Sequence, residues 1–208
     1  MKRECELTSK QQMRRQRIEA AAYAVLDEVG YGGASMLAIA RRASASNETL
    51  YNWYGNKQGL FRSLVEANAG DAKDLLDDAL SSNGDPLDTL TRLGPILLTL
   101  VTGRRAVSLN RAAAGDVNDT GTLGRAIAEA GRDTIVPRMR SLIERAQEAG
   151  LIVTDDSAEA ADVYIRLLVG DLQIRRVIGV VDELSQDEIA VRSRQALRLF
   201  LAIYRPAR

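Results

Sequence analysis

The sequence predicts an all-α protein, with an N-terminal three-helix domain followed by a C-terminal helical bundle. Apolar residues recur at helical spacing through most of the 208 residues, which is the pattern of amphipathic helices. Capping residues and glycines stand between these stretches, where helices begin and end. No stretch alternates polar and apolar residues over the length of a strand, and the apolar run 151–153 is too short for a sheet.

The first helix is expected over residues 10–29, where apolar residues mark one face. Gly30 is expected to end it, because glycine is a common residue just past helix C-termini. Ser35 then suits the N-cap of a short helix over residues 36–42, since its hydroxyl can accept from a free amide of the first turn.

A second short helix is expected over residues 47–53, with Ser46 as its N-cap. Asn56 suits the N-cap of a long helix that runs from residue 57 to about 80. Two short helices joined by a few residues, after a longer one, are the sequence form of a helix-turn-helix. We therefore place this motif at about residues 35–54.

The next helix is expected to begin at Asp85 and Pro86, which suit its N-cap and its first helical position. The pair Gly94-Pro95 is expected to kink or break the helix that follows, because proline lacks an amide hydrogen and clashes with the preceding turn. Further helices are expected over residues 104–114, 122–149 with Pro137 interrupting, 157–178, and 185–204 with a capping box of Ser185 and Glu188.

The charge is balanced overall but unevenly distributed along the chain. Lys and Arg number 28 and so do Asp and Glu, which gives a formal net charge of zero. Residues 1–62 hold ten basic and six acidic groups, a charge of +4, and the rest of the chain therefore carries −4. A basic N-terminal part balanced by an acidic remainder indicates a polyanionic partner for the basic part.

The composition excludes several classes of chemistry. The chain has no histidine, so a Ser-His-Asp triad, a histidine base and His-bearing metal sites are excluded. The single cysteine, Cys5, can form neither an internal disulfide nor a multi-thiolate metal site. We expect no catalytic residues, no metal and no cofactor. No signal peptide or membrane-length apolar run is present, so a cytoplasmic protein with no membrane partner is expected.

The second short helix carries the small polar groups that a recognition helix uses to reach bases and phosphates. They are Ser46, Asn47, Glu48, Thr49 and Asn52. Arg41, Arg42, Lys57 and the basic run at 14–17 surround it and supply attraction to phosphates. Four apolar and aromatic groups are expected to pack between this helix and the next: Leu50, Trp53, Tyr54 and Phe61.

The region around this motif resembles a known family. Residues 18–61 read IEAAAYAVLDEVGYGGASMLAIARRASASNETLYNWYGNKQGLF, which is similar to the DNA-binding domain of the TetR family of bacterial transcriptional regulators. The similarity extends over roughly residues 12–72, which we take as the DNA-binding domain, with an effector-binding and dimerisation domain at 73–208. The resemblance implies a dimer that binds a pseudo-palindromic operator and a small-molecule effector.

By position, the resemblance also assigns DNA-contacting residues. Thr49 and Tyr51 match residues that contact DNA, the tyrosine at the phosphate backbone, and Lys57 matches a phosphate-binding lysine at a helix N-terminus. Ser46, Asn47 and Asn52 occupy variable, exposed positions that set the sequence read, and Ser35 offers a further phosphate contact.

The sequence departs from the family pattern at the turn and just after it. Ser44 stands where a turn glycine is common, and a left-handed backbone costs energy for any other residue. Trp53-Tyr54 replaces the usual His-Phe, and Gln58 replaces a common Glu. These substitutions keep similar size or polarity, so we expect the fold to be retained.

The last two predicted helices carry more apolar surface than one buried face needs, so we expect them to be buried on more than one side. The resemblance to the TetR family implies that they form a four-helix dimer interface, and the alternative is that they complete a monomer core. Arg111 and Tyr164 are the candidate polar contacts of an effector pocket. The apolar candidates are Leu97, Leu100, Val101, Met139, Ile143 and Leu167. The segment 109–134 also resembles the C-terminal domain of an AefR-like subgroup of the family.

The sequence thus predicts a ligand-responsive DNA-binding regulator, most simply a repressor that a small molecule releases from double-stranded operator DNA. Two alternatives remain at this stage. One is an all-helical scaffold for protein interactions, and the other is a small-molecule enzyme that works without histidine.

Overall fold

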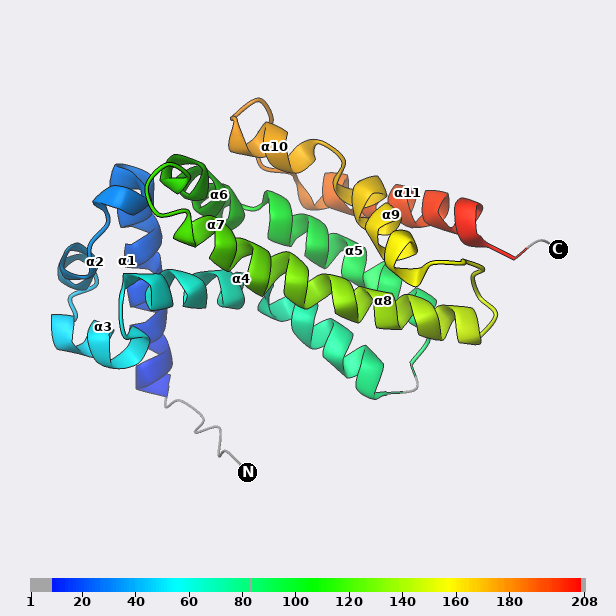
Figure 1. Ribbon diagram of the computed structural model, residues 1–208, viewed down its shortest axis with the longest axis horizontal. Coiled ribbons are helices and arrows are strands. Elements are labelled where there is room, and N and C mark those ends of the chain that lie inside the picture. Colours follow the sequence, from blue (N-terminus) through cyan, green and yellow to red (C-terminus); the bar gives the residue numbers. More distant parts are fainter. Residues whose placement is uncertain (1–8, 83, 207–208) are drawn as a thin grey trace.

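The computed structural model describes residues 9–82 and 84–206, and every regular element within these ranges is a helix. Cys5 lies outside them. Three helices form the N-terminal head: α1 (Ser9–Gly33), α2 (Met36–Arg42) and α3 (Asn47–Tyr54). They lie together at one end of the molecule, and α4 (Lys57–Ser81) runs from them into the body (Figure 1).

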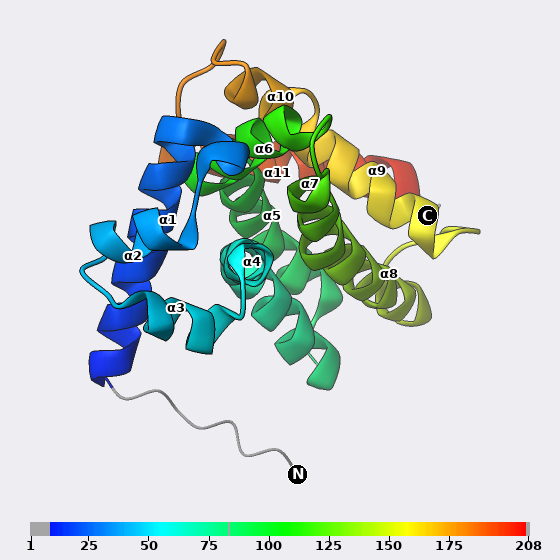
Figure 2. The ribbon, with the colours of Figure 1, turned by 60° about the vertical axis from the view of Figure 1, so that its left-hand side comes forward.

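The body consists of seven α-helices and one π-helical turn within the described residues. They are α5 (Pro86–Thr102), α6 (Arg104–Asp116), α7 (Thr122–Ile127), the turn η1 (Ala128–Arg132), α8 (Asp133–Glu148), α9 (Ser157–Val169), α10 (Leu172–Val177) and α11 (Gln186–Tyr204). Viewed along α4, the head helices lie on one side of it and α5 and α8 on the other (Figure 2). The all-α prediction is confirmed.

The predicted caps form as expected. Ser35 accepts from the amide of Ala38 and Ser46 from that of Thr49, each at 3.1 Å, and Asn56 accepts from the amide of Gly59 at 2.8 Å. The capping box at the start of α11 also forms, between Ser185 and Glu188. These local bonds fix where the helices begin, because each satisfies an amide that has no partner inside its helix.

Neither proline ends its helix: α5 continues past Pro95 and α8 continues past Pro137, where an interruption was predicted. Pro95 lies inside α5, where Gly94 allows a close approach: a Cβ there would lie 3.0 Å from the Tyr164 hydroxyl and 3.1 Å from Ser193 Cβ. Burial against α9 and α11 outweighs the one backbone bond that the proline removes. Pro137 lies inside α8, and the interruption of the predicted helix over 122–149 falls earlier, at the π-helical turn η1.

Gly30 interrupts the first helix, as predicted: its backbone is non-helical (φ 67°, ψ −179°), and a short further helical stretch follows to Gly33. Another helix boundary differs from the prediction. The predicted helix over 157–178 is interrupted at Gly170 (φ 53°), so α9 and α10 are separate. Ile174 and Ile178, which follow this interruption, are exposed.

The molecule has two hydrophobic cores, and α4 contributes to both. Leu60, Phe61 and Leu64 pack into the head core, whereas Leu75 and Leu76, further along α4, pack into the body core. The predicted division at residues 72 and 73 falls within this helix. The head core also receives side chains from the body, namely Leu109, Ala112, Ala113 and Leu123 of α6 and α7.

Candidate nucleic-acid interface

The turn between α2 and α3 places α3 at the surface of the head. Ser44 has a left-handed backbone (φ 49°). This agrees with its place in the turn, where the family pattern commonly has a glycine. Arg17 of α1 donates from Nη2 to the carbonyl of Ala43 at 2.7 Å and to that of Ser44 at 3.2 Å. These bonds from a charged group offset the strain at the serine and hold the turn against α1.

One face of α3 is buried and the other is open. Leu50 is fully buried and anchors the helix in the head core, as predicted, whereas Trp53 is 38% exposed. The expectation that Trp53 packs in the core is therefore wrong. The indole lies beside the buried face of α3, next to the Arg14 guanidinium, and does not enter the head core.

The predicted DNA-contacting residues of α3 fall into two groups. Asn47, Tyr51 and Asn52 are exposed, Tyr51 at 48%, and no hydrogen bond within the described part of the chain holds their side chains. The hydroxyls of Ser46 and Thr49 instead lie 2.7 Å apart in the cap of the helix. The first group is available to a partner, and the second shapes the helix start.

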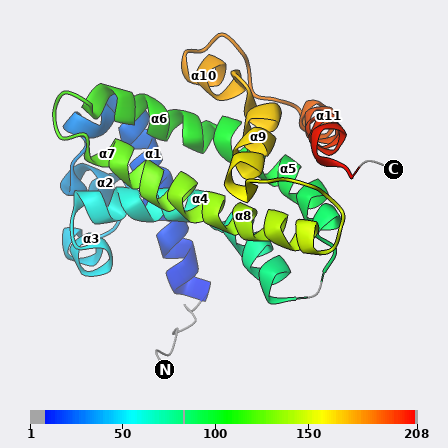
Figure 3. The same cartoon turned by 45° about the vertical axis from the view of Figure 1, so that its right-hand side comes forward.

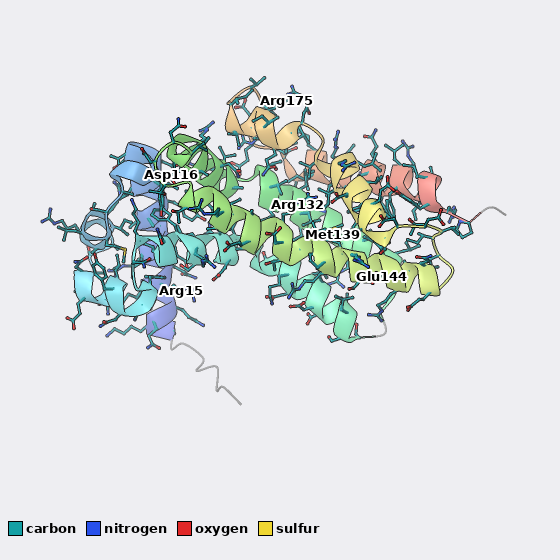
Figure 4. The ribbon with its side chains drawn as sticks, viewed as in Figure 1. Arg15, Asp116, Arg132, Met139, Glu144 and Arg175 are labelled. Carbon is teal, nitrogen blue, oxygen red and sulfur yellow. The ribbon has the colours of Figure 1, made fainter. Side chains whose placement is uncertain are left out.

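Arg14 of α1 completes this surface, although the sequence placed it only within a basic run. Its Nη2 donates to Thr49 Oγ1 at 2.8 Å, and its Cζ lies 5.6 Å from the Trp53 ring centroid. The neighbouring Arg15, on the same part of α1, instead pairs with Glu19 at 3.0 Å (Figure 4). The Arg14 guanidinium therefore lies at the edge of the exposed face of α3, which we call the recognition face.

Lys57 lies at the start of α4, where the sequence placed it. Its Nζ donates to the carbonyl of Tyr31 at 2.9 Å and lies 4.3 Å from the Tyr31 ring centroid. The ammonium is thus held beside the free amides of a helix N-terminus, where an anion is favoured. Ser35, also exposed, caps α2.

Gly59 is a structural residue of this interface that the sequence reasoning missed. A Cβ at this position would overlap the carbonyl oxygen of Tyr54, the last residue of α3. The glycine therefore lets the end of the recognition helix approach α4 closely. Its position three residues after the Asn56 cap is the available sequence signal.

Comparisons with known proteins agree with this geometry. Residues 18–64 match the family described as bacterial regulatory proteins of the tetR family, and residues 88–206 match the AefR-like transcriptional repressor C-terminal domain. The second match alone spans more than half of the chain. The chain belongs to the TetR family. It is a TetR-family transcriptional regulator in fold and class, and not an enzyme.

Individual TetR-family proteins share about a quarter of their residues with this chain. The chain is 24% identical over 155 residues to the HTH-type transcriptional regulator YvkB of Bacillus subtilis (strain 168), covering 74% of this chain and 78% of that protein. A TetR-family regulator from Mesorhizobium loti MAFF303099 is 25% identical, with a TM-score of 0.74 over 94% of this chain and 98% of the other. The Flavonoid-responsive Regulator FrrA is 27% identical, with a TM-score of 0.67 over 95% and 100%.

The body of this TetR-family chain contains an open cleft of about 590 Å³ between α4, α5 and the start of α6. Among its lining residues are Asn68, Asp71, Thr99 and Leu100. Of the predicted pocket residues, Leu100 lines this cleft. The size falls within the range of small-molecule sites in proteins.

The other predicted pocket residues lie elsewhere. Tyr164 is fully buried and donates to the carbonyl of Leu90 at 2.8 Å, and burial raises the pKa of its hydroxyl well above the usual value. Three of the apolar candidates are also in the body core: Leu97, Met139 and Ile143. Arg111 lies on α6, at a second hollow, so the structure does not bring Arg111 and Tyr164 into one described cavity.

In residues 9–82 and 84–206, no group of three or more acidic or cysteine side chains is arranged to hold a metal ion. No helix in the same ranges is long and apolar enough to cross a membrane.

Proposed function

We propose that this TetR-family regulator is a dimeric repressor that binds a pseudo-palindromic operator through α3 and is released by a small molecule. It acts on cytoplasmic DNA, with residues 12–72 as the DNA-binding domain and residues 73–208 as the effector and dimerisation domain. The observation that carries the proposal is the open face of α3, where Asn47, Tyr51 and Asn52 have no intramolecular partner within the described residues.

The exposed side chains have complementary roles on DNA. Asn47 and Asn52 carry amides that pair with the edge of an adenine, so they read sequence in the major groove. Tyr51, Ser35 and Lys57 contact phosphates and fix the register of the head on the duplex. Thr49 and Ser46 contribute through the cap of α3, with Arg14 reaching the same edge of the groove.

The dimer interface is proposed on α9 and α11. Leu199 and Ile203 lie one turn apart on α11 and are 39% and 58% exposed. Phe200, between them, is buried, so the outer face of the helix is apolar beyond what the core uses. A second copy that packs there gives two recognition helices related by a two-fold axis, as a pseudo-palindrome requires.

The effector site is proposed in the cleft between α4, α5 and α6. Support comes from its volume and mixed lining, and from FrrA, a similar regulator whose name states that it responds to flavonoids. Because α4 begins at the recognition helix and passes this cleft, a ligand there can move the head by shifting α4.

Selection of bound duplexes from a random pool tests the proposal. We expect a pseudo-palindromic consensus, with half-sites about one helical turn or a multiple of it apart. Asn47→Ala changes the preferred bases, whereas Arg92→Ala, a charge change on the exposed face of α5, leaves the consensus intact. A pool that shows no enrichment, together with no salt-sensitive binding, would support the helical scaffold instead.

A further inference from the structure

A second hollow, of about 440 Å³, lies where the head meets the body. Its walls come from α1, α6 and α10. The lining residues are Leu26, Asp27, Gly30, Arg104, Val107, Ser108, Arg111, Ala112 and Arg176. Figure 3 shows α10 beside one end of α6, with α1 behind it. The hollow is distinct from the proposed effector cleft, although Arg104 lines both.

Three guanidinium groups line this hollow, from Arg104, Arg111 and Arg176, against one carboxylate, that of Asp27. Among the ion pairs of the described residues, none includes any of these four side chains. The walls of the hollow thus carry an excess of positive charge that the described part of the chain does not pair.

Arg176 differs from the other two arginines because it is buried, with only 9% of its surface exposed. Its Nε donates to the carbonyl of Thr102 at 3.0 Å and its Nη1 to that of Val181 at 2.8 Å. Arg111 is held in the same way, with its Nε 2.6 Å from the carbonyl of Val177. These carbonyls satisfy hydrogen bonds and orient the guanidinium groups, but they supply no opposite charge.

Burial of a cation is costly unless an opposite charge compensates it. Helices α1, α6 and α10 nevertheless place a buried arginine and two exposed ones around one space. We propose that this hollow binds a small organic anion, a carboxylate or phosphate ester, whose charged group lies among the three arginines. Leu26, Val107 and Ala112 form the apolar part of the wall, which fits a compact apolar portion of the same ligand.

The site joins the two functional parts of the protein. Gly30, at the kink of α1, lines the hollow, and the carbonyl of the next residue, Tyr31, accepts from Lys57. An anion bound between α1 and α6 therefore fixes the position of α1 relative to the body. This inference goes beyond the proposed function and does not require that the chain bind an operator.

Thermal unfolding in matched-ionic-strength chloride, phosphate and benzoate tests the site. We expect phosphate, benzoate or both to raise the unfolding midpoint of the parent by about 3 °C more than chloride does, at concentrations well above the dissociation constant. A shift with phosphate indicates that the hollow binds a phosphate group, and a shift with benzoate indicates that it binds a carboxylate. If neither exceeds chloride, the proposal is overturned.

Variants locate the effect. Arg104→Gln and Arg111→Gln change exposed arginines, so both variants are expected to fold and to lose the anion-specific shift. Arg105→Gln removes the same charge next to Arg104 but outside this hollow, and it retains the shift. Lys57→Ala also retains it. A shift that survives Arg104→Gln and Arg111→Gln, or that disappears in Lys57→Ala, would place the anion elsewhere and overturn the proposal.

Discussion

Arg14 of α1 lies over the indole of Trp53 on α3, with its Cζ 5.6 Å from the ring centroid. The same guanidinium donates to Thr49 Oγ1, so one side chain joins the first helix to both turns of the recognition helix. The contact depends on Trp53, which stands where a histidine is usual in similar sequences. The surface that we propose for DNA therefore includes part of α1.

Trp53 is the only tryptophan of the chain, which makes this contact directly measurable. We expect operator DNA to change its emission, because the indole lies at the edge of the recognition face. Arg14→Ala changes the emission of the free protein and weakens operator binding by about tenfold, which corresponds to about 1.4 kcal/mol. Arg92→Ala on α5 is the control. Unchanged emission at saturating DNA would show that α3 does not approach the duplex.

Lys57→Ala is expected to weaken binding to operator and random duplexes by similar factors, because a phosphate contact carries no sequence information. The slope of log affinity against log salt should fall by about one unit. Titration by fluorescence anisotropy over a salt series measures both. Lys73→Ala, further along α4 and paired with Asp77, should leave the slope as it is. An unchanged slope in Lys57→Ala argues against a phosphate at this lysine.

Gly59→Ala tests the close approach of α3 and α4. The added methyl group would overlap the Tyr54 carbonyl, so α3 must shift or the head loses about 1–3 kcal/mol of stability. We expect a lower unfolding midpoint together with weaker operator binding. Gly70→Ala, where a Cβ meets open space on the same helix, is the matched control and should keep or raise stability. Equal behaviour of the two variants would contradict the close approach.

Asp116, at the end of α6, is buried and accepts from the hydroxyl of Thr120 at 2.8 Å and the amide of Leu123 at 3.4 Å (Figure 4). Burial alone would raise the pKa of this carboxyl, but the hydrogen bonds from Thr120, Leu123 and Thr122 outweigh it and lower the pKa below 3.8. A carboxyl whose pKa is lowered by folding stabilises the fold at pH values above its ordinary pKa. This contribution is lost as the pH falls through the lowered value.

Asp116→Asn is therefore expected to lower the free energy of unfolding by about 1–3 kcal/mol near neutral pH. The difference from the parent should begin to shrink as the pH falls below 3.8 and should disappear as the pH falls through the lowered pKa of the folded carboxyl. Urea unfolding at several pH values measures it. Asp119→Asn, in the same turn, is the control and should have a smaller effect, because Asp119 is exposed. A constant difference at all pH values would exclude the carboxylate as its source.

Leu199→Glu tests the proposed dimer face of α11. A charge on an exposed apolar face of a monomer costs little, whereas at a buried interface it lacks a partner and weakens association. We expect a monomer by light scattering, with operator affinity strongly reduced. Val117→Glu, at an apolar residue of the α6–α7 turn that is 69% exposed, should leave the assembly unchanged. A dimer in both variants would place the interface on another surface.

The sequence was sufficient for the helices whose signals are local. Ser35, Ser46 and Asn56 each satisfy an amide within three residues, so the starts of α2, α3 and α4 follow from neighbouring residues alone. The exposure of Asn47 and Asn52 follows in the same way, because Leu50 fixes which face of α3 is buried.

The features that depend on distant segments were not predictable in this way. Pro95 stays helical because Gly94 packs against Tyr164 and Ser193, which lie on two later helices. Tyr164 was a candidate pocket residue, and its hydroxyl is instead bonded to Leu90, 74 residues earlier. The role of Arg14 likewise depends on where α3 crosses α1, which no local pattern records.

The contribution of α6 and α7 to the head core has a consequence for how the protein folds. A fragment that ends at residue 72 lacks Leu109, Ala112, Ala113 and Leu123, and so leaves one wall of that core open to water. We therefore expect residues 12–72 not to fold stably as an isolated fragment. Because α4 contributes to both cores, we expect unfolding of the head to be coupled to unfolding of the body.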